Sequence, residues 1–400
     1  MEFPKKITID ACERFLGKLS KSEGIDDALQ LPVATSGYAS SFGGLAGAIQ
    51  AVNSWVRQSD GRVLSLRASD AKNQIDEVIK RPHKFAAAMM AKSIMMQSQP
   101  EKDVRAEINV VAKRAIEDQA LNQFGQQHGG LCWFAFVDHS SKGFDRNFYI
   151  EKSGTNPEPR QPEQFKAVIR AMVNKAMSVP GGARGIAPES LEYLGRIFYE
   201  LFLNTHEHGS RSATRSEWLK PGVRIIYAQG INLHEVGFRN AANQQPVLAE
   251  YLLKASGNNP AEQQRRFVEI GIVDSGLGYC GRWRADHSLA DANEAPSTEE
   301  EYEIFKKCFR FRQTSTAKDS KGNGLPVVMD RLTKLKGFMR VRSGRLALYR
   351  DFLSSPYSPN DACFFSDWTS AQSAEESLTP MAKASGVAIS LLIPLEAKNE

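Results

Sequence analysis

The chain has 400 residues, 42% of them hydrophobic and 24% charged, with a formal net charge of +5. A domain commonly takes about 100 to 200 residues, so two domains are expected, and this composition excludes wholesale disorder. The positive charge includes no dense run of Lys or Arg, so it permits contact with nucleic acid without indicating it.

Targeting segments and disulfides are not indicated. The apolar run at 387–392 is far shorter than the roughly 20 residues that a membrane-spanning helix needs. The N-terminal MEFPKKITID leads into Cys12, Glu13 and Arg14 instead of a continuous apolar run, so it does not resemble a signal peptide. The five cysteines are scattered and form no CxxC pair, which argues against a disulfide framework or a zinc site. We expect a cytoplasmic protein with reduced thiols and no membrane partner.

Residues 1–160 are predicted to form a mixed α/β domain. A short apolar run at 31–35 comes before four apolar residues at helical spacing, Leu45, Ile49, Val52 and Val56. This pattern predicts a strand followed by a helix. Residues 70–122, rich in Ala, Met, Lys and Glu, are predicted as two helices broken near 97–101. The aromatic run at 131–138 predicts a buried strand.

Two clusters of helix breakers indicate a domain boundary. Three prolines lie within 151–164, PGGARG occupies 180–185, and the boundary is placed between these clusters, so that the second domain spans 180–400. Its predicted elements are a helix from Pro188, strands at 223–231 and 267–274, a helix at 326–336, and strands at 338–343 and 386–394. This order predicts an α/β sandwich with helices on one face of a mixed sheet.

The first candidate site segment is YELFLNTHEHG, residues 199–209. Glu200 and Asn204 are four residues apart, so on a helix their Cβ atoms lie about 5–6 Å apart on one face, which Glu207 or His208 extends. A carboxylate can polarise an attacking water, and an amide oxygen can ligate Mg²⁺, as phosphate-ester chemistry requires. The alternative is an ordinary solvated helix face.

The second segment is EIGIVDSGLG, residues 269–278, in which Asp274, Gly276 and Gly278 directly follow an apolar strand. A carboxylate at the end of a strand can accept a hydrogen bond from an exocyclic amine, and glycines let the backbone approach a ligand closely. The alternative is a simple turn.

The third segment carries glycines at the start of a helix. Lys321, Gly322, Gly324 and Leu325 come just before Pro326, which suits the first turn of a helix. Free backbone N–H groups and the positive end of the helix then face the glycine loop, and phosphate is the natural ligand for that arrangement.

Taken in this order, the three segments resemble the N, G1 and G2 boxes of the gyrase, Hsp90, histidine-kinase and MutL (GHKL) ATPase superfamily. Its nucleotide-binding unit is called the Bergerat fold. NTHEHG at 204–209 is similar to the NxxxHG form of sensor histidine kinases and anti-sigma-factor kinases. The final strand resembles the closing strand of the family, with Val387 where threonine is usual. The resemblance covers about 188–394.

The resemblance implies a role for each matching residue. Glu200 would be the general base, Asn204 the Mg²⁺ ligand, and Asp274 the adenine partner. The other residues implied at the nucleotide are His208, Gly276, Gly278, Lys321, Gly322, Gly324 and Leu325. Residues 279–321 would form an ATP lid, expected to be mobile without nucleotide because its acidic, polar stretch offers little apolar surface. The long interval after Asn204 suggests an inserted helix near 241–256.

The N-terminal half carries a second, shorter resemblance. Residues 36–55 resemble the strand-turn-helix of STAS domains, the anti-sigma-antagonist fold, in which a serine at the turn can be phosphorylated. Ser40 and Ser41 lie at about that place, although no acidic residue directly precedes them. The alternative is a Ser-Gly turn that only starts a helix.

The expected function is a Mg²⁺-dependent ATP-binding switch or ATPase that couples its nucleotide state to a partner through the N-terminal domain. One alternative is a protein kinase of the anti-sigma or histidine type, and another is a nucleotide-gated interaction module without turnover. ATP and Mg²⁺ are the expected ligand and cofactor. The expected partner is another protein or a second copy of the chain.

Overall fold

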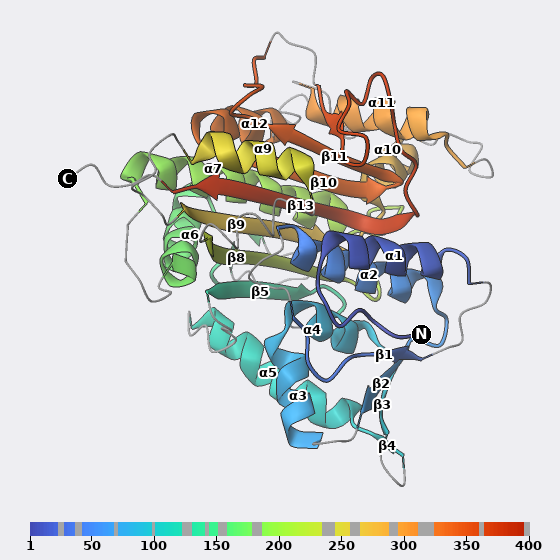
Figure 1. Cartoon of the computed structure of the whole chain (residues 1–400). Helices are drawn as coiled ribbons and strands as arrows, with labels where there is room; N and C mark the ends of the chain where they lie inside the picture. Colours follow the sequence, from blue (N-terminus) through green and yellow to red (C-terminus); the bar gives the residue numbers. More distant parts are fainter. Residues whose placement is uncertain are drawn as a thin grey trace.

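A large antiparallel sheet lies at the centre of the computed structural model (Figure 1). The structure describes residues 1–22, 28–36, 42–67, 71–97, 101–121, 130–140, 144–150, 158–177, 186–233, 245–256, 265–287, 295–310, 324–359 and 364–395. Among these residues, no helix is long and apolar enough to cross a membrane.

The helices of the described residues are α1 (Ile9–Leu19), α2 (Gly44–Gln58), α3 (Ala71–Lys80), α4 (Pro82–Met90), α5 (Arg105–Ala120), α6 (Pro162–Met177), α7 (Pro188–Asn204), the π-helical η2 (Thr205–Gly209), α9 (Pro246–Ala255), α10 (Gly278–Asp286), α11 (Thr298–Phe309) and α12 (Gly324–Lys334). The strands are β1 (Leu29–Gln30), β2 (Val63–Arg67), β3 (Ser93–Gln97), β4 (Lys102–Asp103), β5 (Leu131–Val137), β6 (Tyr149–Ile150), β7 (Glu158–Pro159), β8 (Val223–Leu233), β9 (Arg265–Asp274), β10 (Phe338–Gly344), β11 (Leu346–Asp351), β12 (Ser366–Asp367) and β13 (Ala384–Pro394).

The central sheet has seven strands in the order β12-β11-β10-β13-β9-β8-β5. Each neighbouring pair is antiparallel. A smaller sheet, β1-β2-β3-β4, lies in the N-terminal half, where β1, β2 and β3 run parallel and β4 runs antiparallel to β3. The two sheets and the surrounding helices confirm the predicted α/β class.

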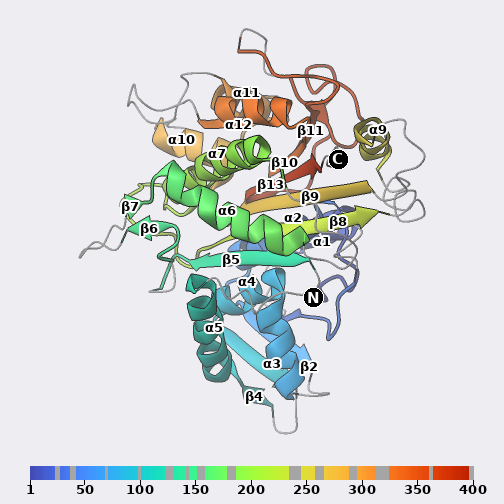
Figure 2. The same ribbon diagram turned by 90° about the vertical axis from the view of Figure 1, so that its left-hand side faces the viewer.

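Both faces of the central sheet are apolar. In β5, Trp133 and Ala135 pack in a core with side chains of α1, α2 and α4, whereas Phe134 and Phe136 pack in a second core with α6, α7 and α12. Successive side chains of a strand point to opposite faces, so a strand that is apolar at every position is buried on both sides. Figure 2 shows α6 and α7 on one face and α1 and α2 on the other.

Two details of the predicted architecture are wrong. The large sheet is antiparallel in its described pairings, not mixed. Helices also cover both of its faces instead of one, since the apolar side chains of β5 that point away from α7 have to be buried by the N-terminal helices.

The predicted boundary between residues 160 and 180 passes through the large sheet's own core. β5 pairs with β8 along its whole length, although the prediction assigns β5 to the first domain. Phe165 and Met172 of α6 lie in the same core as Phe134. The division into 1–160 and 180–400 therefore stays a prediction, and β5 and α6 belong with the elements of the second half.

Several predicted elements of the first half are also corrected. The short strand is β1, at 29–30, and not 31–35. The segment 70–122 contains three helices, α3, α4 and α5, and the strand β3 at 93–97, in place of two helices. β3 has the sequence SIMMQ, and its Met and Ile residues suit both a helix and a buried strand, so composition did not separate the two. In the second half, the predicted helices and strands are confirmed, including the inserted helix, which is α9.

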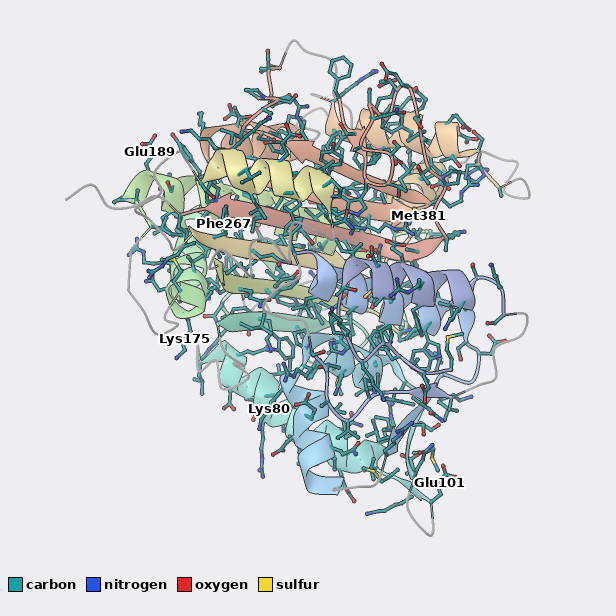
Figure 3. The ribbon with its side chains drawn as sticks, viewed as in Figure 1. Lys80, Glu101, Lys175, Glu189, Phe267 and Met381 are labelled. Carbon is teal, nitrogen blue, oxygen red and sulfur yellow. The ribbon has the colours of Figure 1, made fainter. Side chains whose placement is uncertain are left out.

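α9 covers the part of the sheet that α2 leaves open. Tyr251 and Leu252 of α9 pack with Phe267 of β9 and Phe338 of β10 in a third cluster. Figure 3 labels Phe267 between the sheet and α9. The face opposite α7 is thus completed by elements from both halves of the chain.

The middle of the sheet depends on a glycine in β9. Tyr227 of β8 lies directly over Gly271, and its hydroxyl donates to the buried carboxylate of Glu269 at 2.5 Å. A Cβ on Gly271 would overlap the Tyr227 ring. Only a glycine leaves room for this ring, because side chains in a packed core cannot shift freely.

We therefore expect Gly271→Ala to lower the free energy of unfolding by about 1–3 kcal/mol, through overpacking against Tyr227. Urea denaturation measures this loss. Gly17→Ala is the matched control, because Gly17 lies in α1 with no atom within 4 Å of an added Cβ. This variant is expected to gain about 0.5–1 kcal/mol from helix propensity. Equal stabilities for the two variants would contradict this packing.

Candidate functional site

The first candidate residue, Glu200, lies on the buried side of α7. Pro188 stands in the first turn of this helix, and Leu194, Ile197 and Leu201 form its apolar face. The Glu200 carboxylate pairs with Arg196 at 2.6 Å. Its Oε2 lies 2.9 Å from the point where a Cβ on Gly324 would be, so it faces the first residue of α12. The structure thus brings Glu200 and Gly324 together.

The electrostatic surroundings of Glu200 favour a basic carboxylate. Burial raises the pKa of Glu200, the nearby Arg196 lowers it, and Glu207 raises it further. A carboxylate that is partly desolvated but kept ionised by one arginine is more basic than one in water.

Asn204 is the last residue of α7 and lies immediately before the π-helical turn η2. Its Nδ2 is buried and has no hydrogen-bond partner among the described residues. A buried donor without a partner costs free energy, so such groups are usually explained by a water or a ligand. π-helical turns are also frequent at functional sites, which gives this end of α7 a second local signal.

Asp274 is the last residue of β9, and its side chain is enclosed by glycines. A Cβ on Gly209 would lie 2.5 Å from the Asp274 Cγ. The Asp274 Oδ1 accepts from the backbone N–H of Gly276 at 2.8 Å and from that of Val387 at 3.3 Å. The backbone of Val387 therefore contacts Asp274 even though its side chain is not a threonine.

Burial raises the pKa of Asp274 to about 6, and the hydrogen bonds from Gly276 and Val387 offset part of this shift. A desolvated carboxylate at the end of a strand can accept a hydrogen bond from a ligand.

Close contacts leave no room for a side chain at Gly276 and Gly278, the two glycines after Asp274. A Cβ on Gly276 would lie 2.6 Å from the Gly209 carbonyl oxygen, which brings the turn at residues 274–278 (the G1 turn) against the end of η2. Gly278 begins α10 with φ of +73°, a conformation that glycine adopts at little cost. Ser343 accepts there from the backbone N–H of Tyr279 at 3.1 Å.

The start of α12 supplies part of the third predicted segment. Gly324 begins the helix beside Glu200, and the Leu325 side chain is buried in the core. Leu325 therefore has only its backbone to offer a ligand. Lys321 and Gly322 lie outside the described residues, as do Ser40 and Ser41.

His208 lies in η2 and is held by an arginine that the sequence did not suggest. Arg215 donates to the His208 Nδ1 at 3.0 Å, to the Glu207 carbonyl at 3.0 Å, and to both carboxylate oxygens of Asp286. Burial, with the charge of Arg215, lowers the pKa of His208 to about 4, so the ring is neutral at pH 7. Since Asp286 ends α10, this arginine links η2 to the helix that follows the G1 turn.

The predicted lid, 279–321, contains two helices packed on the protein. α10 follows Gly278 directly, and α11 buries Tyr302, Phe305 and Phe309 in the core beside α7 and α12. The expectation that this segment has little apolar surface is wrong for α11. Residues 288–294 and 311–321 lie outside the described residues, so the mobile lid stays a prediction.

A stripe of polar residues on α2 contacts the backbone at Asp274 and Ser275 from the face of the sheet opposite α7. Gln50, Asn53 and Ser54 are fully buried, and Arg57 is half-buried. Asn53 donates to the Asp274 carbonyl at 3.0 Å, and Arg57 donates to the Ser275 carbonyl at 3.0 Å. The sequence analysis missed these residues, although their spacing of three, one and three places them on a single helix face.

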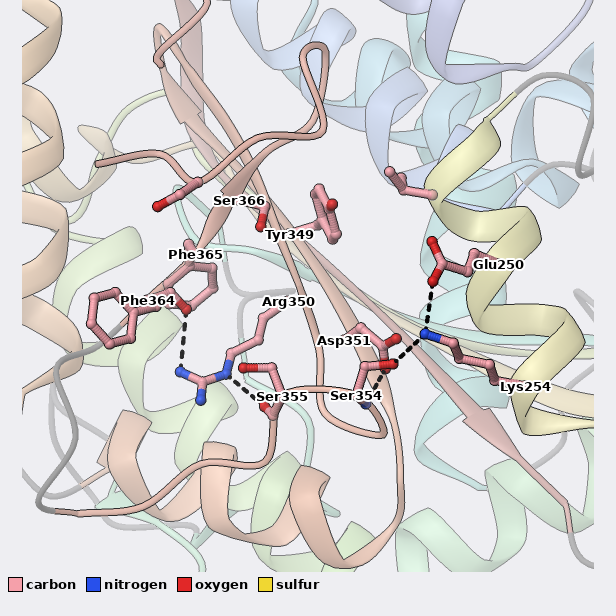
Figure 4. Close-up of a pocket in the computed structure, with 12 residues that line it drawn as sticks. Glu250, Lys254, Tyr349, Arg350, Asp351, Ser354, Ser355, Phe364, Phe365 and Ser366 are labelled. Carbon is pink, nitrogen blue, oxygen red and sulfur yellow. Dashed lines mark hydrogen bonds and ion pairs between the residues drawn. The ribbon is translucent and has the colours of Figure 1, made fainter. Parts of the chain in front are cut away.

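A separate surface pocket of about 290 Å³ lies beside α9 and β11 and contains none of the predicted site residues. Figure 4 shows its charged groups already engaged. Lys254 pairs with Glu250, and Arg350 donates to the carbonyls of Ser355 and Phe364. Because these charges are satisfied by the protein, we do not favour this pocket over the region around Asp274.

Comparisons with models of known protein families, with curated proteins and with solved structures give no match. The functional argument therefore depends on the chain's own residues. The structure brings parts of the predicted segments together in two places: Glu200 faces Gly324, and Gly209 and Gly276 enclose Asp274. The candidate residues that the structure describes are Glu200, Asn204, His208, Asp274, Gly276, Gly278, Gly324 and Leu325.

The raised pKa of Asp274 predicts a pH-dependent stability. Its folded-state pKa lies above its ordinary value, so folding favours the neutral acid, and stability is lost as pH rises through about 6. Asp274→Asn removes this loss. The variant is expected to gain about 2 kcal/mol relative to wild type between pH 4 and pH 7.5, measured by urea denaturation across that range.

Glu269→Gln is the matched comparison on the same strand. Burial raises the pKa of Glu269 to about 7, against the lowering effect of its hydrogen bonds from Tyr227 and Gly43. Its gain over wild type should therefore develop about one pH unit higher than that of Asp274→Asn. A stability difference independent of pH in both variants would contradict these shifts.

Proposed function

We propose that the chain is a Mg²⁺-dependent ATP-binding switch or ATPase of the GHKL type. The observation that carries the proposal is the meeting of three distant segments: Glu200 faces Gly324, while Gly209 and Gly276 enclose Asp274. In the sequence these segments match the N, G2 and G1 boxes. Unrelated turns and a solvated helix face would not be expected to converge in this way.

Each residue has a chemical role in this proposal. Glu200 orients and deprotonates the attacking water, a task suited to a partly desolvated carboxylate. The Asp274 carboxylate would accept a hydrogen bond from the adenine amino group. The Asn204 side chain would hold Mg²⁺ through its oxygen, and the ion would neutralise phosphate charge.

The start of α12 suits a phosphate group. The positive end of the helix dipole lies at Gly324, and a glycine there leaves room beside Glu200. The water that Glu200 activates would thus stand next to the phosphate end of the site, while Asp274 defines the adenine end.

The N-terminal half would receive the nucleotide state through α2, which contacts the backbone after Asp274. A protein partner or a second copy of the chain would then respond to that state. A kinase would use the same site to transfer the γ-phosphate to a hydroxyl or an imidazole, and a binding module would leave ATP intact. Incubation with γ-labelled ATP separates these functions, because the label goes to water, to protein or nowhere.

Two variants test whether the site turns ATP over. Glu200→Gln keeps the size and most hydrogen bonding but removes the base, so phosphate release should fall by roughly 10² to 10⁴-fold while ATP affinity changes little. Asn204→Ala should weaken both affinity and turnover, since it removes the proposed Mg²⁺ ligand. Phosphate release and ATP binding are measured on the same samples.

Glu189→Gln, at the exposed start of α7, is the control and should behave as wild type. Wild-type turnover in Glu200→Gln would show that Glu200 is only a structural residue of α7.

A further inference from the structure

Helix α2 presents an unusual buried surface to the end of β9. Its neighbours in sequence are Ala, Val, Ile and Trp, yet Gln50, Asn53 and Ser54 are fully buried among them. Polar groups in a core cost free energy unless they are hydrogen-bonded. The hydrogen-bond partners of these three side chains therefore indicate the function of the polar stripe.

The partners are backbone atoms of the G1 turn, of the closing strand β13, of β10 and of Pro221. Asn53 donates to the Asp274 carbonyl at 3.0 Å, and Arg57 donates to the carbonyls of Ser275 and Pro221 at 3.0 and 2.6 Å. Gln50 donates to the Arg342 carbonyl of β10 at 2.9 Å and to the Gly386 carbonyl at 3.4 Å, and Ser54 accepts from the Ser385 N–H at 2.9 Å. Asp274 and the strand segment that donates to its carboxylate are therefore both held by one helix.

These hydrogen bonds are not what stability alone would favour. The side-chain oxygens of Gln50 and Asn53 are buried with no hydrogen-bond partner among the described residues. A half-satisfied amide in a core is less favourable than an apolar side chain of the same shape. We infer that the hydrogen bonds donated by the side-chain N–H groups of Gln50 and Asn53 have a function that offsets the free energy lost at their unpartnered oxygens.

We propose that Asn53 and Arg57 are positioning residues for the adenine end of the nucleotide site. By holding the peptide carbonyls of Asp274 and Ser275, they set the direction in which the Asp274 carboxylate points. The inference rests on the proposed function, because it takes Asp274 as the adenine partner. It also makes α2 the physical connection through which the N-terminal half and nucleotide binding influence each other, and that influence is reciprocal.

The test compares ATP and GTP affinities of folded full-length variants by calorimetry in Mg²⁺. Asn53→Leu keeps the volume and removes the donor to Asp274. We expect its ATP dissociation constant to rise about 3- to 30-fold and its preference for ATP over GTP to fall by a similar factor. Asp274→Asn is the positive control and should lose the same preference.

Glu13→Gln is the matched structural control. Glu13 of α1 pairs with Arg340 and Arg342 of β10 on the same face of the sheet, instead of with the backbone at Asp274 and Ser275. The variant should lower the melting temperature while keeping the wild-type ratio of ATP to GTP affinity. A purely structural α2 would make Asn53→Leu behave like Glu13→Gln, which would overturn the positioning role.

If Asn53→Leu does not fold, the ATP and GTP affinities are compared in Arg57→Met instead, at the half-buried end of α2. It removes the donor to Ser275 and keeps the side-chain stem, so a loss of ATP preference is again expected. Unchanged preference in the folded variant would overturn the inference. Absence of ATP binding by wild type would instead refute the proposed function itself, and the positioning role with it.

Discussion

The apolar character of both faces of the central sheet is the constraint on which the rest of the structure depends. Strands such as β5 and β9 have no solvent-facing side, so two layers of helices have to cover them. α6, α7 and α12 form the layer of helices on one face of the sheet. The other layer has to come largely from the N-terminal half, and α2 is its innermost helix. The two halves are therefore joined by a shared core instead of a linker.

This arrangement explains why the candidate site has contacts from both sides. Gly209, at the end of the turn that follows α7, packs against the Asp274 side chain from one layer, and the stripe on α2 reaches the backbone at Asp274 from the opposite layer. A rigid sheet between the layers limits how far Asp274 can move. Movement of α2 would consequently shift the backbone at Asp274 and Ser275.

The sequence predicted the elements of the second half well because their apolar periods are long and bounded by Pro or Gly, as in α7 and α12. It placed Asp274 and Gly276 at the end of a strand for the same reason, since the apolar run stops clearly there. It failed at β3, whose Met and Ile suit either helix or strand. Breaker residues also do not reveal that β5 pairs with β8. Arg215 and Asn53 act through contacts distant in sequence, which a single sequence does not disclose.

The most direct test of the central claim is hydrogen exchange with and without a non-hydrolysable ATP analogue and Mg²⁺. If one nucleotide site joins the three segments, exchange should slow together at 204–209, 274–279 and 324–328, because their backbone N–H groups become ordered around the same ligand. GTP at the same concentration should slow it less, given the proposed role of Asp274. Unchanged exchange in these segments, or protection confined to the pocket beside α9, would contradict the account.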